Sequence, residues 1–125
     1  MTNRPISPHI QIYRPQITSI LSITHRFTGI ALTLASCIFC VGLFSFALSE
    51  TAWEMFISTC HLMGGKIWQW PLIFAVHYHA MNGIRHLAWD MGYGFNIKTV
   101  TQTSILVIIL SIMATLSFAH FCSIL

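Results

Sequence analysis

The feature that most constrains the fold is a run of 22 residues, from Phe27 to Leu48, that contains no charged side chain. A helix of this length rises about 33 Å, enough to cross a hydrocarbon core of about 30 Å. A second uncharged apolar run covers residues 103–125. Only 7% of the 125 residues are charged, whereas soluble domains carry about a quarter. The sequence therefore predicts an all-α integral membrane protein.

A third apolar segment lies between these two runs and is less hydrophobic, because it contains three histidines and an arginine. Trp68 and Trp89 mark its ends, and a helix between them rises roughly 32 Å, close to bilayer thickness. Tryptophans at that separation are typical of the two interfaces of a membrane span. Prolines at positions 5, 8 and 15 predict a largely extended or irregular N-terminal arm. We therefore expect one membrane-anchor domain over residues 1–125, with an arm at 1–20 and spans at about 22–48, 65–90 and 102–125.

The distribution of cations predicts the orientation, because membrane proteins keep an excess of Lys and Arg on the cytoplasmic or matrix side. Cations gather on the N-terminal arm and around the end of the second span, at Arg4, Arg14, Arg26, Arg85 and Lys98. The loop expected between the first two spans has only Lys66, beside Glu50 and Glu54. We therefore place the N-terminus on the positive side. The net charge of +3, with no basic run, argues against nucleic-acid binding.

One face of the second span carries residues that could bind a redox group. At 100° per residue, His79, Gly83, His86 and Asp90 form a stripe, and His77 points about 160° away from His79. A neutral imidazole is a good axial ligand for haem iron, and a nearby glycine lets a flat macrocycle approach the helix. Arg85 and His86 could meet the haem propionates by charge-assisted hydrogen bonds. The alternative is a histidine that is hydrogen-bonded to a neighbouring helix.

A second cluster, Ser22, His25 and Arg26, lies at the start of the first span. Positions three and four residues apart share a helix face, so a hydroxyl, an imidazole and a guanidinium converge near the positive-side interface. Such donors could hold a quinone carbonyl or a propionate. The alternative is that Arg26 extends to lipid phosphate, as is common at span ends.

No other histidine of the chain is expected to match His79 in both depth and direction. His120 should lie roughly 9 Å from it in depth, His25 should be displaced toward the positive side, and His77 faces away. If a haem iron here has two axial ligands, we therefore expect the second from another chain.

Two segments resemble signatures of a known family. The residues RPISPHIQIYRPQITSILSITHRFT, from Arg4 to Thr28, and HAMNGIRHLAWDMG, from His79 to Gly92, are similar to the two signatures of the succinate dehydrogenase cytochrome b subunit. This subunit is the large membrane anchor of succinate:quinone oxidoreductase, respiratory complex II. The resemblance implies three transmembrane helices that contribute to a heterodimeric helical bundle around a haem b.

The resemblance also implies roles for individual residues. His79 corresponds to the axial haem ligand, with the other axial histidine supplied by a second, smaller membrane-anchor subunit. The quinone-binding positions are Ser22, Ile23 and Arg26, and the haem propionates and pocket involve His25, Arg26, Gly29, Gly83 and His86. The implied partners are the iron–sulfur and flavoprotein subunits, and the implied location is a bacterial or mitochondrial inner membrane.

The implied function is electron relay from the iron–sulfur subunit to ubiquinone, with no catalytic residue for succinate oxidation in this chain. Asp90 and Arg85 are candidates for a proton path, or for an interface or a mutual ion pair. Three alternatives stay open: the anchor of a quinol:fumarate reductase, a haem-free transporter or channel subunit, and a structural anchor with no redox group.

Overall fold

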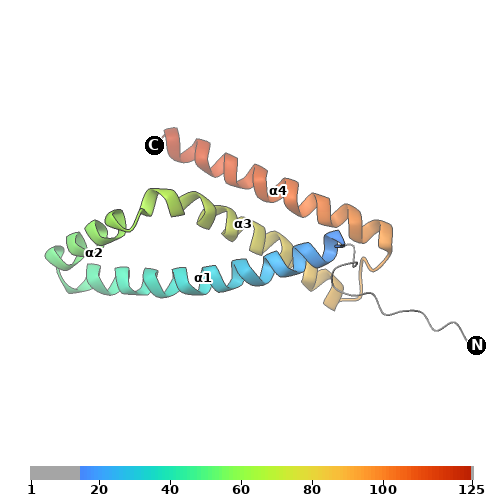
Figure 1. Cartoon of the computed structure of the whole chain (residues 1–125), viewed down its shortest axis with the longest axis horizontal. Coiled ribbons are helices and arrows are strands. Elements are labelled where there is room, and N and C mark those ends of the chain that lie inside the picture. The colour runs from blue at the N-terminus through green and yellow to red at the C-terminus, as the bar shows by residue number, and fades with distance from the viewer. Residues whose placement is uncertain (1–14, 125) are drawn as a thin grey trace, which may run out of the picture.

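The computed structural model describes residues 15–124, which form four helices and, within that range, no strand (Figure 1). The helices are α1 (Ile17–Leu48), α2 (Glu50–Leu62), α3 (Gly65–Asp90) and α4 (Ile97–Ile124). The prediction of an all-α chain is confirmed. The expected second span at 65–90 coincides with α3, while α4 begins five residues before the expected third span.

Two expectations are wrong. The segment between the first two expected spans is not a loop but α2, whose 13 residues are too few to cross a bilayer. The arm was expected to reach residue 20, but α1 begins at Ile17, so its last four residues are helical. The prediction of an extended or irregular arm at 1–14 lies outside the described residues.

Local signals explain where the helices begin and end. Ser49 accepts a hydrogen bond from the Ala52 N–H at 3.1 Å and so caps α2, directly after α1 ends. Gly92, with a φ of +87°, ends α3 through bonds from its own N–H to Trp89 and from Tyr93 to Ala88. These paired bonds are a Schellman motif, which favours glycine because of the left-handed backbone.

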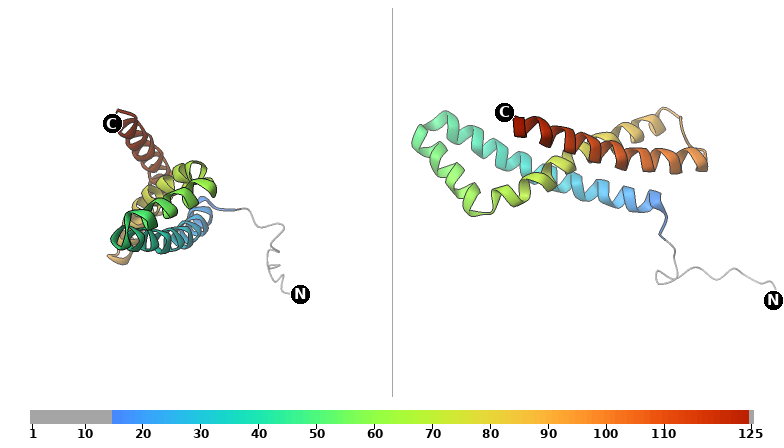
Figure 2. Two further views of the ribbon diagram at one scale, coloured as in Figure 1. Left: turned by 90° about the vertical axis from the view of Figure 1, so that its left-hand side faces the viewer. Right: turned by 90° about the horizontal axis from the view of Figure 1, so that it is seen from above.

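The three long helices run up, down and up, and α3 packs against both α1 and α4 (Figure 1). In the end-on view of Figure 2, α4 diverges from the other helices. The small core contains Leu21, Tyr78 and Val107, one from each long helix. The Tyr78 hydroxyl donates to the Leu21 carbonyl oxygen at 2.9 Å, which ties α3 to α1.

The distribution of polar and apolar side chains in the bundle is the reverse of that in a water-soluble protein. Among the residues whose burial is described, four polar side chains are buried, namely Asn82, Arg85, Ser104 and Ser111, while large apolar side chains cover the outside of every helix. Ser104 and Ser111 donate to carbonyls one turn earlier in α4, which satisfies their hydroxyls internally. Small or polar residues at helix contacts and apolar residues facing outward are the pattern of a protein whose solvent is lipid.

Two of the helices are long and apolar enough to cross a membrane by themselves, α1 over 17–48 and α4 over residues 97–122. The sequence predicted three spans, and α3 is not among these two because of its polar stretch. The start of α1, the end of α3 and the start of α4 lie at one end of the bundle, and α2 lies at the other (Figure 1). Arg26, Arg85 and Lys98 belong to the halves of their helices nearer that end. The side of the membrane on which this end lies stays a prediction.

Candidate functional site

Three imidazoles meet where α1 contacts α3. The rings of His25 and His79 are stacked, with centroids 3.9 Å apart and planes at 11°. The ring of His86 lies 5.3 Å from that of His25 and is tilted by 40°. The structure therefore joins the stripe predicted on α3 with the cluster predicted on α1.

The predicted depth of His25 is wrong. The sequence placed His25 apart from His79 because the first span was expected to begin near residue 22. Since α1 begins at Ile17, His25 lies more than two turns inside the helix and contacts His79. A face-to-face stack directs the in-plane lone pairs of both rings sideways, so His25 in this arrangement does not oppose His79 across a shared metal.

The His79 ring is held by two residues of α1. Its Nδ1 lies 3.2 Å from the hydroxyl of Thr28, which also donates to the His25 carbonyl oxygen at 2.8 Å. A Cβ added to Gly29 would come within 3.1 Å of His79 Cε1, so the ring lies directly over that glycine. Gly83 lies beside His25, whose Cε1 would be 4.0 Å from an added Cβ. Both predicted pocket glycines are therefore next to the stacked histidines.

A cleft of about 390 Å³ opens beside these histidines. It contains all three residues predicted to bind quinone, together with Arg85 and His86, and is lined by Thr18, Ser19, Ser22, Ile23, Arg26, Arg85, His86 and Trp89. Ser22 is half-buried, while Ile23 and Arg26 are exposed. The cleft is therefore rich in hydrogen-bond donors and cations.

One of the two cations on this cleft, Arg85, is buried and incompletely paired. Arg85 is 7% exposed, its Nη1 donates to Asn82 Oδ1 at 3.2 Å, and its guanidinium lies 4.2 Å from the centre of the Trp89 ring. The Nε and Nη2 of Arg85, the Nδ2 of Asn82 and the Nδ1 of His25 have no hydrogen-bond partner within the described chain. A buried charge without a counter-charge is costly, so this site is electrostatically suited to an anionic group from outside the chain.

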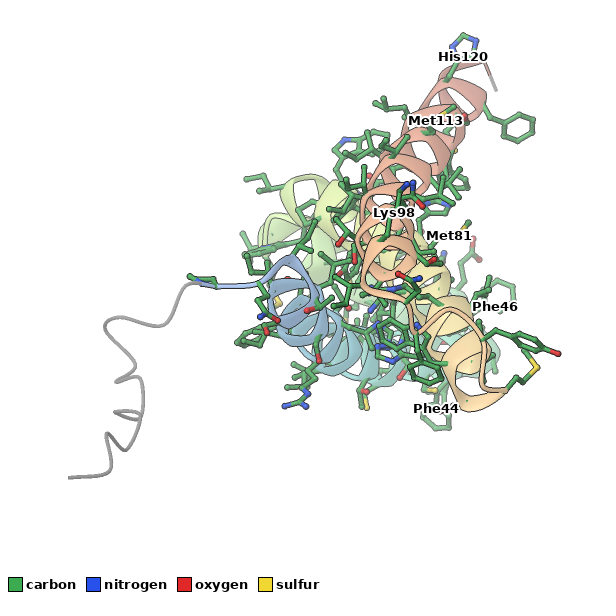
Figure 3. All side chains as sticks on the ribbon, turned by 90° about the vertical axis from the view of Figure 1, so that its right-hand side faces the viewer. Phe44, Phe46, Met81, Lys98, Met113 and His120 are labelled. Atoms are coloured by element: carbon green, nitrogen blue, oxygen red, sulfur yellow. The ribbon has the colours of Figure 1, made fainter. Side chains whose placement is uncertain are left out.

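The remaining predicted residues lie apart from the histidines. Asp90 is exposed at the end of α3 and forms no ion pair with Arg85, so the predicted alternative of a mutual pair is not seen in residues 15–124. His77 was expected only to point away from His79, and it faces α4, where its Nδ1 lies 3.2 Å from the Thr115 hydroxyl. His120 lies at the C-terminal end of α4, on the part that stands away from the other helices (Figure 3).

The sequence analysis did not assign four residues to this site, namely Thr18, Ser19, Thr28 and Trp89. Three of these carry hydroxyls on α1, and hydroxyls in membrane helices usually bond their own backbone, so the sequence alone gave no sign of further partners. Spacing could have identified Thr18, since it lies four residues before Ser22 on the same face of the helix.

Comparison with known proteins gives a consistent result. Residues 1–118 match the family described as the succinate dehydrogenase/fumarate reductase transmembrane subunit. The chain is 43% identical to the succinate dehydrogenase cytochrome b556 subunit of Rickettsia felis, over 90% of this chain and 88% of that protein. It is 39% identical to the mitochondrial cytochrome b560 subunit of Sus scrofa and 36% identical to that of Homo sapiens, in both cases over 94% of this chain and 71% of the relative. The chain therefore belongs to the family of succinate dehydrogenase/fumarate reductase transmembrane subunits.

Proposed function

We propose that this chain is the haem b- and quinone-binding membrane anchor of succinate dehydrogenase and relays electrons from the iron–sulfur subunit to ubiquinone. The observation that carries this proposal is the convergence of two predicted sets of residues. His79, His25 and His86 cluster between α1 and α3, and the adjoining cleft contains Ser22, Ile23 and Arg26. Relatives with cytochrome b names, which match nearly the whole chain, support the same conclusion.

The chemistry of the residues fits a haem b. His79 would bind the iron, and Gly29 lets the His79 ring lie directly against α1. The unpartnered Nε and Nη2 of Arg85, with His86 and Arg26 on the same cleft, would meet the propionate carboxylates by charge-assisted hydrogen bonds. His25 Nδ1 is a further unpartnered donor or acceptor for the same group. When bound, the haem would supply a one-electron redox centre.

The second axial ligand would come from the smaller membrane-anchor subunit. In residues 15–124, the only other ring in contact with that of His79 is the ring of His25, which is stacked rather than opposed. The bundle would thus be completed by helices of the partner, which would also cover part of the exposed apolar surface of α1 and α4.

Ubiquinone would bind in the cleft beside the histidines. The Ser22 hydroxyl and the Arg26 guanidinium would donate to a quinone carbonyl oxygen, and Ile23 would pack against the ring. These donors polarise the carbonyl and stabilise the negative charge that develops on its oxygen during reduction. Reduction to the quinol needs two electrons and two protons, and Asp90 and His86 would belong to the path by which protons arrive from the positive side.

The arrangement in the membrane follows from charge and helix direction. We infer that α3 also spans the membrane, between α1 and α4 in chain order, since its 26 residues are long enough and its most polar side chains are buried. The start of α1 and the α3–α4 connection would lie on the cytoplasmic or matrix side of an inner membrane, where the flavoprotein and iron–sulfur subunits dock.

The test is the absorption spectrum of the purified complex carrying His79→Ala. His77→Ala is the matched control, because His77 lies on the same helix, is also half-buried and contacts α4 instead. We expect b-type bands that shift on reduction in the unmodified complex and in His77→Ala, and loss of these bands in His79→Ala. Unchanged haem content in His79→Ala would refute the assignment of the ligand. A complex without any b-type bands would favour a haem-free anchor, transporter or channel subunit.

A quinol:fumarate reductase anchor remains the second candidate, because the matching family description includes both enzymes. The two differ in the direction of electron flow, so reduction of ubiquinone by succinate, compared with oxidation of a low-potential quinol by fumarate, separates them.

A further inference from the structure

The hydroxyl of Thr28 has two neighbours but only one proton. Its oxygen lies 2.8 Å from the His25 carbonyl oxygen and 3.2 Å from His79 Nδ1. A carbonyl oxygen can only accept, so an O···O distance this short requires the hydroxyl proton to point to His25. This is the usual behaviour of a threonine inside a helix, which donates to a carbonyl one turn earlier.

The contact between Thr28 and His79 then determines which ring nitrogen of His79 carries a hydrogen. Because the Thr28 proton is already used, its oxygen is the acceptor for His79, and Nδ1 of His79 carries a hydrogen. In a neutral imidazole the other nitrogen, Nε2, therefore keeps a free lone pair. The nitrogen that binds a metal is set by the hydrogen bond that the other nitrogen makes.

The orientation of the ring is fixed from three sides. Thr28 contacts its Nδ1, and His25 stacks on one face with ring centroids 3.9 Å apart. Gly29 lies next to Cε1, which would be only 3.1 Å from a Cβ atom added to that glycine. A 180° flip of the ring about its bond to the Cβ atom would put a carbon in place of Nδ1 opposite Thr28, and a smaller rotation would tilt the ring out of its stack with His25. The lone pair on Nε2 therefore has a defined direction.

We propose that Thr28 is a positioning residue that selects the tautomer and ring orientation of His79 and tunes the haem bound to it. This inference rests on the proposed ligation of haem iron by His79. A hydrogen bond from Nδ1–H to an oxygen acceptor increases the basicity of the ligating nitrogen, which favours ferric over ferrous iron and lowers the haem potential.

The contact between His77 and Thr115 is a matched control for the contact between His79 and Thr28. His77 Nδ1 lies 3.2 Å from the Thr115 hydroxyl, and Thr115 donates to the Ser111 carbonyl oxygen at 2.8 Å. The chemistry and the distances are the same, but His77 faces α4 and has no proposed role. Thr115→Val therefore removes an equivalent hydrogen bond without touching the candidate ligand.

The experiment compares Thr28→Val, Thr28→Ser and Thr115→Val in the intact complex. The readouts are the haem midpoint potential, the electron paramagnetic resonance g-values of the ferric haem and the rate of haem loss to an acceptor protein. For Thr28→Val we expect a more positive potential, shifted g-values and haem loss faster by roughly 10-fold or more, as for other partners of metal-bound histidines. Thr28→Ser and Thr115→Val should resemble the unmodified complex, because each leaves an acceptor for His79.

Several outcomes would overturn this assignment. One is a Thr28→Val complex with unchanged potential, g-values and haem loss, and another is a Thr28→Ser complex that shifts as much as the valine variant. If Thr28→Val does not assemble, Thr28→Ala removes the same acceptor with a smaller side chain and is judged by the same three readouts. Failure of the proposed function looks different, since haem would then be absent from the unmodified complex or retained in His79→Ala.

Discussion

Replacing Gly29 by alanine tests whether the His79 ring lies where the structure places it. The added Cβ would be 3.1 Å from His79 Cε1, about 0.4 Å closer than the distance of about 3.5 Å at which carbon atoms pack well. The ring cannot simply turn away, because Thr28 holds its Nδ1. Overpacking of this kind costs about 1–3 kcal/mol.

Alanine also brings a gain, since it stabilises a helix interior relative to glycine by up to about 1 kcal/mol. We therefore expect Gly29→Ala to destabilise the complex by about 0–2 kcal/mol. Gly83→Ala is the matched control, because its Cβ would have only His25 Cε1 nearby, at an ordinary 4.0 Å. Without haem, Gly83→Ala should be neutral or stabilising.

The assay is thermal unfolding of the detergent-solubilised complex, prepared from haem-deficient cells and again from haem-replete cells. In the haem-deficient preparation Gly29→Ala should melt below Gly83→Ala, by an amount corresponding to about 1–3 kcal/mol. Equal melting temperatures would refute the placement of the His79 ring over Gly29. In the haem-replete preparation, a fall in haem content for Gly83→Ala would support a macrocycle lying against that glycine.

Two further predictions concern α3. Tyr78→Phe removes the buried bond to the Leu21 carbonyl oxygen and should lower the free energy of unfolding by about 0.5–1.5 kcal/mol with haem content unchanged; an unaltered melting temperature in detergent would contradict this. Asp90→Asn should slow ubiquinone reduction by succinate, by up to about 100-fold if it is a positioned proton donor. Full activity of the assembled Asp90→Asn complex would remove Asp90 from the proton path.

The sequence was most informative where the polarity of a residue indicates its place along or around a single membrane helix. The predicted span at 65–90 coincides with α3 because Trp68 and Trp89 lie near its two ends. The polar stripe was recognised because lipid makes each such residue costly. The cleft could be predicted in part, since Ser22 and Arg26 share a helix face. All these inferences use information that lies within a single helix.

The contacts of the site were missed where the answer depends on two helices at once. The contact between His25 and His79 depends on where α1 begins and how it meets α3, and neither is encoded in the spacing of residues on one helix. Thr28 was overlooked for the same reason, because its second partner is 51 residues away. The helix α2 did leave a local signal, a serine cap followed by Glu50 in the first turn, which the expectation of a loop ignored.

The buried polarity of α3 has a consequence for how the protein is made. Once α3 spans the membrane as proposed, Asn82 and Arg85 must leave the translocation channel into a place already shielded from acyl chains. Such shielding would come from α1, α4 and the proposed second anchor subunit, whereas α1 and α4 are hydrophobic enough to partition alone. We therefore expect insertion of α3, the least lipophilic helix and the one that carries the candidate ligand, to depend on its neighbours.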